Sequence, residues 1–127
     1  MVAYSFMVRF ADAVATGRKR QTVRANRKRH ARPGERLQLY AGMRTKHCRK
    51  LVADPVCRSV EAIRIDVRQD GRLAIGITGP SGRERSLTSR DRQRFAEADG
   101  FASQADMHAF WAAAHGYGLF EGVLISW

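Results

Sequence analysis

The sequence predicts a single α+β domain, mainly β, built as a small barrel of about six strands with short peripheral helices. Its apolar segments are short and most alternate with other side chains, as half-buried strands require. Turn signals separate these segments, and helix-capping patterns occur only late in the chain. The 127 residues suffice for one buried core, and no repeat, linker or low-complexity tract divides them. We therefore treat residues 1–127 as one domain.

The first half of the chain predicts three strands and one helical turn. Residues 4–10 alternate, which indicates a half-buried strand. A helical turn over residues 12–16 is expected to end at Gly17, because glycine readily adopts the conformation that closes a helix. Extended segments follow at 21–24 and, after the Pro33-Gly34 turn, at 37–41.

The second half predicts further strands joined by tight turns. Segments 50–53 and 56–67 look extended, and Asp70-Gly71 predicts a hairpin turn into a strand over 73–77. Another turn over 80–82 precedes a short strand at 86–88, and the apolar segment 122–127 ends the chain as a strand.

Two capped helices are expected before that last strand. Thr88 and Asp91 have the spacing of a capping box for a helix that runs to about Ala98. The tripeptide Asp99-Gly100-Phe101 interrupts it, and a second capping box begins at Ser103. Apolar residues then recur with helical spacing, which predicts a core-facing stripe rather than a ligand site. The stripe consists of Met107, Phe110, Trp111 and Ala114.

The positive charge is concentrated in one segment. Residues 18–50 contain thirteen Lys or Arg and one acid, Glu35, whereas the net charge of the whole chain is +11. Such a concentration favours a polyanionic partner, with RNA or a nucleotide as the obvious class. No apolar stretch approaches the roughly 20 residues of a membrane span, and the N-terminus lacks a signal peptide. We expect a cytoplasmic protein without a membrane partner, and no feature indicates a protein partner.

Neither a metal site nor a cofactor is expected. Cys48 and Cys57 are nine residues apart, and His47 precedes the first, but no paired ligands have zinc-binding spacing. We expect both thiols to be reduced and buried.

Lys19, Thr22 and Arg24 form the pattern most suggestive of chemistry. A threonine hydroxyl becomes a nucleophile when a neighbouring base removes its proton. Lysine can be that base if burial and adjacent cations lower its pKa. In an extended segment Thr22 and Arg24 point to the same face, where they could form one wall of a pocket. A solvated basic loop followed by an ordinary strand threonine is the alternative.

The motifs also resemble a known family. Gly17-x-Lys19-x-x-Thr22-x-Arg24, then Pro33-Gly34-Glu35-x-Leu37 and later Asp99-Gly100-Phe101, look like the ASCH domain family of the PUA-like barrels. The likeness covers nearly the whole chain, which is similar overall to ASCH proteins of bacteria and their phages. It implies a small β-barrel with a cleft that faces RNA or a modified nucleoside.

One branch of that family consists of the acetylcytidine amidohydrolases, which use a lysine, a threonine and a glutamate. By motif match, Lys19 would activate Thr22 for attack on the acetyl carbonyl, and the late acid would pass a proton to the leaving amine. This chain has Asp99 where those enzymes have glutamate, and Glu97 lies two residues earlier. A non-catalytic RNA-binding module and a metal-independent ribonuclease are the alternative functions. Arg24 would hold a substrate carbonyl or phosphate, or else form a structural ion pair with Asp99.

A basic rim is expected beside this cleft. The residues predicted to contact the nucleic acid are Arg18, Arg20, Arg24, Arg27, Lys28, Arg29, Arg44 and Lys46. Tyr40 lies in sequence between the cluster of Arg27 to Arg29 and the cluster of Arg44 and Lys46. It could stack on a base, or could simply be a residue of the barrel wall. The alternative for the charge run itself is a solvated surface without a ligand.

Overall fold

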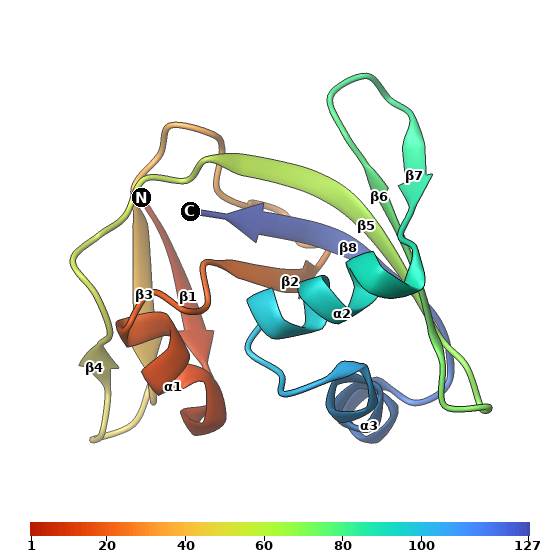
Figure 1. The fold of residues 1–127 in the computed structure, drawn as a ribbon. Coiled ribbons are helices and arrows are strands. Elements are labelled where there is room, and N and C mark those ends of the chain that lie inside the picture. Colours follow the sequence, from red (N-terminus) through yellow and green to blue (C-terminus); the bar gives the residue numbers. More distant parts are fainter.

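Eight strands form two sheets in the computed structural model, which describes residues 1–127 (Figure 1). The elements in chain order are β1 (Val2–Phe6), α1 (Val8–Ala15), β2 (Gln21–Ala25), β3 (Leu37–Ala41), β4 (Arg49–Lys50), β5 (Ser59–Val67), β6 (Leu73–Thr78), β7 (Glu84–Ser86), α2 (Ser89–Ala98), α3 (Gln104–His115) and β8 (Gly118–Ser126). One sheet has the order β1-β3-β4 and the other β2-β8-β5-β6-β7. Only the β1–β3 pair is parallel.

The α+β, mainly β class agrees with the prediction. The strand pairing, however, does not form the predicted closed barrel of six strands. No ladder joins the three-stranded sheet to the five-stranded sheet. The parallel pairing of β1 with β3, which are far apart in sequence, draws these strands into a sheet of their own. Strand β8 pairs with β5 along its whole length and with β2 along its last five residues, so it links the middle of the larger sheet to the site segment.

The first strand is shorter, and the first helix longer, than the alternation of residues 4–10 predicts. Strand β1 ends at Phe6, and α1 buries Phe10, Ala11, Ala13 and Val14, which lie on one helical face. Val8 is 82% exposed, although strand alternation would place it beside Phe6 in the core. The helix therefore begins at Val8, where the spacing of the apolar residues still fits an alternating strand. Gly17 follows the helix in the left-handed region (φ 80°), as predicted.

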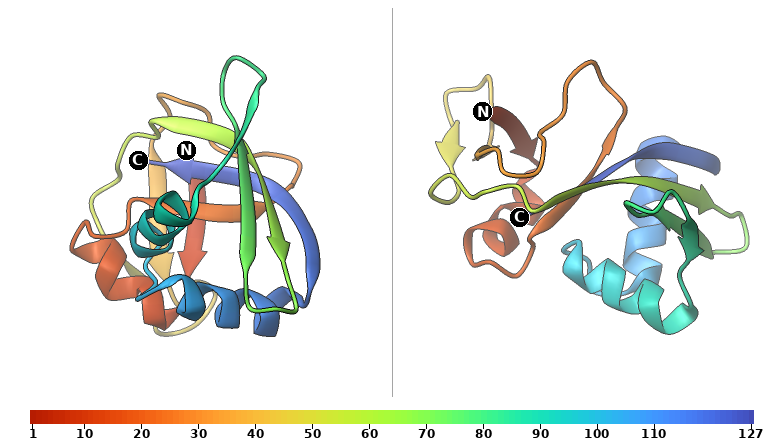
Figure 2. Two further views of the ribbon diagram at one scale, coloured as in Figure 1. Left: turned by 45° about the vertical axis from the view of Figure 1, so that its right-hand side comes forward. Right: turned by 90° about the horizontal axis from the view of Figure 1, so that it is seen from above.

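Both capped helices occur as the sequence predicts. The Thr88 hydroxyl accepts a hydrogen bond from the Asp91 backbone N–H at 3.1 Å, and Ser103 does the same for Asp106 at 3.1 Å. Helices α2 and α3 lie on one side of the five-stranded sheet, while α1 lies beside β1 and β3 (Figures 1 and 2). None of the three helices combines the length and hydropathy needed to cross a membrane.

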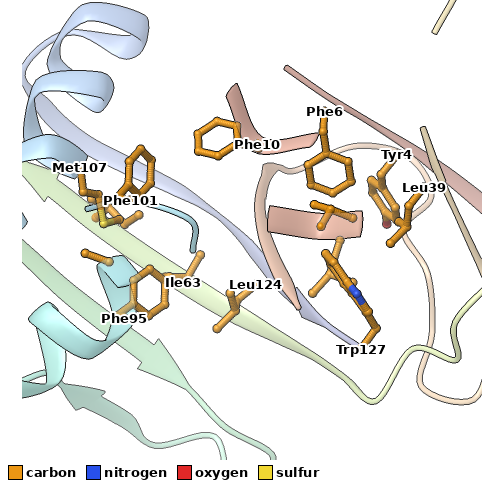
Figure 3. Close-up of a cluster of buried hydrophobic side chains, with 14 of the residues drawn as sticks. Tyr4, Phe6, Phe10, Leu39, Ile63, Phe95, Phe101, Met107, Leu124 and Trp127 are labelled. Atoms are coloured by element: carbon orange, nitrogen blue, oxygen red, sulfur yellow. The ribbon is translucent and has the colours of Figure 1, made fainter. Parts of the chain in front are cut away.

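One core runs through both sheets. It contains 27 buried residues drawn from every helix and most strands. Phe10 lies between a group around Phe101, Met107 and Phe95 on one side and a group around Phe6 and Trp127 on the other (Figure 3). Phe10 of α1 thus joins these two groups of core residues (Figure 3), and its ring lies beside the Lys19 side chain.

Candidate functional site

A pocket of about 260 Å³ opens where the two halves of the core meet. Its polar lining includes Lys19, Thr22, Arg24 and Asp99, so the structure brings together the residues of the sequence motif. The aromatic lining is Phe6, Phe10, Phe101, Phe110, Trp111 and Phe120. The pocket therefore combines buried ionisable groups with walls suited to a planar ligand.

Lys19 and Asp99 form a buried ion pair. The Lys19 ammonium donates to Asp99 Oδ1 at 2.9 Å and to the main-chain oxygen of Asp99 at 2.6 Å. These two residues and Thr22 are the only polar or charged residues that the fold buries, at 3%, 4% and 4% exposure. Because burial of charge is costly without pairing, both contacts to Asp99 are needed to keep Lys19 inside.

Local backbone structure directs both members of the pair inward. The Lys19 N–H donates to the carbonyl of Ala13 in α1 at 2.9 Å, which turns the loop after Gly17 back towards the core. Asp99 is the C-cap of α2, where free carbonyls carry partial negative charge that favours a cation. The Lys19 side chain also lies over the Phe10 ring, with Nζ 5.1 Å from the ring centroid.

Gly100 makes room for the Lys19 side chain. Its φ of +94° lies in the left-handed region, and a Cβ there would come within 3.1 Å of both Lys19 Cδ and Phe10 Cδ1. The turn from α2 to Phe101 therefore requires glycine for its conformation and for its lack of a side chain.

Burial shifts both ionisation equilibria towards the neutral forms. It lowers the pKa of Lys19, and the neighbouring Asp99 carboxylate opposes that shift. Burial likewise raises the pKa of Asp99 against the opposing attraction of Lys19. The amide of Gln21 is close enough to lower the pKa of Asp99, but its Nε2 forms no hydrogen bond of standard geometry. A lysine with a lowered pKa gives up its proton more readily than an exposed lysine does.

Arg24 contacts the nucleophile candidate directly. Its Nε donates to Thr22 Oγ1 at 3.0 Å, and its Nη2 donates to the main-chain oxygen of Ser5 at 2.7 Å. The expected alternative of an Arg24–Asp99 ion pair does not occur, because Lys19 takes the carboxylate. Lys19 and Thr22 line the same pocket but share no hydrogen bond.

Asp99, rather than Glu97, is the acid of the site. Glu97 is exposed on α2 and accepts a hydrogen bond from Gln93 at 2.9 Å, so it faces away from the pocket. The aspartate in place of the glutamate of the resembled enzymes is therefore the carboxylate available to Lys19.

The aromatic walls of the pocket were not expected from the sequence. Phe110 and Trp111 belong to the stripe predicted as core, and Trp111 is indeed buried, yet both also line the pocket. His115, which the sequence left without a role, stacks on Trp111 with ring centroids 4.6 Å apart. The signal available in the sequence was the recurrence of aromatic residues near Asp99 and along α3, which helical spacing alone assigns to packing.

The first basic cluster, Arg27 to Arg29, adjoins the pocket-lining Arg24, because both Arg24 and Arg27 lie over the Tyr4 ring. The guanidinium carbons of Arg24 and Arg27 lie 5.3 and 4.7 Å from the Tyr4 ring centroid. Lys28 is exposed, and Arg29 pairs with Glu35 at 2.7 Å. The hydrogen bonds from Arg29 and from the Arg32 backbone N–H lower the pKa of Glu35 to about 2.

The second basic cluster lies at the opposite end of β3. The loop with Arg27 to Arg29 leads into Leu37, whereas Arg44 and Lys46 follow Ala41 (Figures 1 and 2). Tyr40 does not line the pocket, and Lys50 Nζ lies 5.9 Å from its ring centroid. The two clusters therefore do not form the continuous rim that their proximity in sequence suggests.

Two further predicted contact residues lie on the loop that carries Lys19. Arg18 is exposed and pairs with Asp12 at 2.8 Å. Arg20 is also exposed, and its main-chain oxygen accepts a hydrogen bond from the Trp127 N–H at 3.0 Å. Part of the basic segment is thus neutralised by neighbouring acids.

No group of three or more His, Cys, Asp or Glu side chains is placed to hold a metal ion. Cys57 is buried as expected, but Cys48 is exposed because it lies in the loop before β4. Both cysteines are free thiols.

A scan against protein-family models finds no match, and searches of curated proteins and of solved structures find no significant similarity. Function is therefore inferred from the residues of the pocket and its surroundings.

Proposed function

We propose that this domain recognises RNA or a modified nucleoside and hydrolyses the acetyl amide of acetylated cytidine. The observation that carries the proposal is the meeting of Lys19, Thr22 and Asp99 at one aromatic-walled pocket. Aromatic walls suit a nucleobase, and a buried lysine beside a threonine suits acyl transfer. The same motif supports assignment to the ASCH family, with the two sheets as an interrupted form of its PUA-like barrel.

In this proposal Lys19 is the base that activates Thr22. A neutral lysine amine has two N–H donors and one lone pair. Both donors would go to the two oxygens of Asp99 that already accept from Lys19, which leaves the lone pair free for the Thr22 proton. The Lys19–Thr22 hydrogen bond would form when a ligand fills the pocket, since catalytic hydrogen bonds often tighten only then.

Arg24 would stabilise the attacking oxygen. Its Nε–H already points at Thr22 Oγ1, where negative charge develops as the proton leaves. Thr22 Oγ1 would then bond to the acetyl carbon, the C–N bond would break, and the proton held by Lys19 would pass, with the help of Asp99, to the departing amine. Water would hydrolyse the resulting threonine ester to acetate, with Lys19 again taking and returning a proton.

Hydrolysis of N4-acetylcytidine to cytidine, followed by liquid chromatography, tests the proposal. The Thr22→Ala variant is expected to lose activity by about 10³-fold or more, because it lacks the nucleophile. Thr16→Ala is the matched control, since Thr16 is the exposed C-cap of α1 and does not line the pocket. Equal rates for Thr22→Ala and the wild type would disprove the assignment of the nucleophile.

A non-catalytic RNA-binding module is the second candidate. It is favoured by the fact that Lys19 is already paired with Asp99 and Thr22 with Arg24, so that each polar group has a partner inside the protein. Binding of N4-acetylcytidine without formation of cytidine would select this candidate over the hydrolase.

A further inference from the structure

Trp111 carries a hydrogen-bond donor that the protein itself does not use. Two buried side-chain nitrogens lack a partner, Gln21 Nε2 and Trp111 Nε1. The first is explained by its closeness to Asp99, whose pKa it lowers. The second has no acceptor within hydrogen-bond distance, although Trp111 is only 4% exposed.

The residue that carries this unused donor lines the pocket. Trp111, His115 and Phe120 all line it, and their rings pack on one another, with Trp111 4.6 Å from His115 and 4.7 Å from Phe120. His115 is exposed and ends α3, just before Gly116 at a φ of +81°. His115, which stacks on the indole face, is thus the exposed member of this wall.

An indole N–H is a donor that cannot also accept. Leaving such a group buried without an acceptor costs about 1–3 kcal/mol, and phenylalanine would form an aromatic wall without that penalty. Tryptophan at this position is therefore explained if the acceptor arrives with the ligand, through the pocket that Trp111 lines.

We infer that Trp111 determines specificity by donating its Nε1–H to a carbonyl oxygen on the ring of a bound pyrimidine. This inference rests on the proposed function. An N4-acylated cytosine carries its acyl group on one edge and the C2 carbonyl oxygen further round the ring. With the acyl group at Thr22, the C2 oxygen lies further from Thr22 than the ring nitrogen N3, and we assign it as the acceptor for the wall formed by Trp111, His115 and Phe120. The site would accordingly distinguish 2-oxopyrimidines from rings that lack a strong acceptor at this edge.

Kinetics with a matched pair of substrates tests the inference. N4-acetyl-2-thiocytidine replaces the oxygen with sulfur, which accepts hydrogen bonds weakly. The wild type is expected to prefer N4-acetylcytidine by about tenfold in kcat/KM, as one buried hydrogen bond implies. Trp111→Phe should reduce that preference to less than about threefold by slowing only the oxo substrate. Trp127→Phe is the control, and it should retain the preference of the wild type.

A binding measurement detects the hydrogen bond from the Trp111 indole without requiring catalysis. The chain has two tryptophans, so the two indole N–H resonances in ¹H–¹⁵N spectra can be assigned with Trp127→Phe. Saturating cytidine should move the Trp111 indole proton downfield, and 2-thiocytidine should move it less.

Three results would overturn the inference. Trp111→Phe could keep the oxo preference, or the Trp111 indole could stay fixed while the Thr22 amide shifts; either would leave the proposed function standing. Absence of both hydrolysis and nucleoside-induced shifts would overturn the inference and the proposed function together.

Discussion

The pocket and the basic loops use the same residue types in opposite ways. In the pocket, Lys19 and Arg24 are held by named acceptors, and Lys19 is almost fully buried. On the loops, cations such as Lys28 and Arg44 are exposed, and their side chains keep their conformational freedom. Burial makes a charge costly, directional and adjustable in pKa, whereas exposure makes it a weak attractor that salt screens. Composition alone assigns all of these cations to one patch.

The loops themselves differ from each other. Arg27 lies over the same Tyr4 ring as Arg24, which lines the pocket. Arg44 and Lys46 follow the other end of β3, where Ala41 pairs with the pocket-lining Phe6, but neither cation lines the pocket or lies over Tyr4. The two clusters can therefore be tested separately.

The largest effect is expected from breaking the buried pair. Lys19→Met or Asp99→Asn should lower the free energy of unfolding by about 3–5 kcal/mol, because each leaves a buried partner without its counter-charge or acceptor. Arg18→Met, which breaks the exposed pair with Asp12, should cost at most about 1 kcal/mol. Urea denaturation measures all three. The double variant Lys19→Met/Asp99→Asn should lose less than the sum of the two single losses, and a fully additive loss would contradict the coupling.

A smaller loss is expected when the room for Lys19 is filled. Gly100→Ala combines a strained left-handed residue with contacts at 3.1 Å to Lys19 and Phe10. Gly71→Ala is the matched control, since its φ is +88° but no atom lies within 4 Å of its would-be Cβ. Strain alone should cost about 1–2 kcal/mol in the control, and crowding should add about 1 kcal/mol or more at Gly100. Equal melting-temperature shifts for the two variants would show that the crowding is relieved.

The two basic clusters should differ in RNA binding. Replacing Arg27 and Lys28 with alanine should weaken binding of a single-stranded RNA by about tenfold at 0.1 M salt and reduce the salt slope by about 1.4, as two lost phosphate contacts imply. The equivalent change at Arg44 and Lys46 should have less effect, because neither residue lines the pocket or lies over Tyr4 beside Arg24. Fluorescence anisotropy at several salt concentrations measures both variants, and equal slopes would show that the contact with Tyr4 does not matter.

The smallest effect is a pH dependence on the loop beside the pocket. The pKa of Glu35 falls from 4.5 to about 2 in the fold, so its contribution to stability is present above pH 4.5 and is lost as pH falls through 2. Glu35→Gln should therefore show a flatter fall in melting temperature between pH 5 and pH 2 than the wild type. Glu97→Gln, an exposed acid without a cationic partner, should behave as the wild type does. If the melting temperature of Glu35→Gln fell between pH 5 and pH 2 as steeply as that of the wild type, this contribution of Glu35 to stability would be excluded.

Local signals predicted the helix caps and one hairpin correctly, whereas the bounds of several strands differ from the prediction, and β8 begins at Gly118 rather than at residue 122. The capping pairs at Thr88 and Ser103 and the hairpin at Asp70-Gly71 rely on neighbours in sequence, and each occurs where predicted. The alternation of residues 4–10 failed at Phe6 because apolar residues with a helical period can also alternate over a short stretch. The parallel pairing of β1 with β3 depends on tertiary packing that no local pattern encodes.

The candidate site was partly predictable. Motif resemblance named Lys19, Thr22 and Asp99, and the structure places them at one pocket. The partner of each residue was not predictable, since Lys19 rather than Arg24 holds Asp99. Trp111 was assigned to the core because helical spacing reports which face is buried, not which buried atom lacks a hydrogen bond.

The contact between Lys19 and Asp99 also has a consequence for the order in which the protein folds. The two residues are 80 positions apart, so closing this contact requires most of the chain to be in place. During synthesis Lys19 leaves the ribosome long before Asp99 exists, and its ammonium group must stay hydrated until then. Fragments that stop before α2 ends contain the threonine and the lysine but no counter-charge. The pocket can therefore be assembled only late, after the hairpins and helix caps that depend on nearby residues.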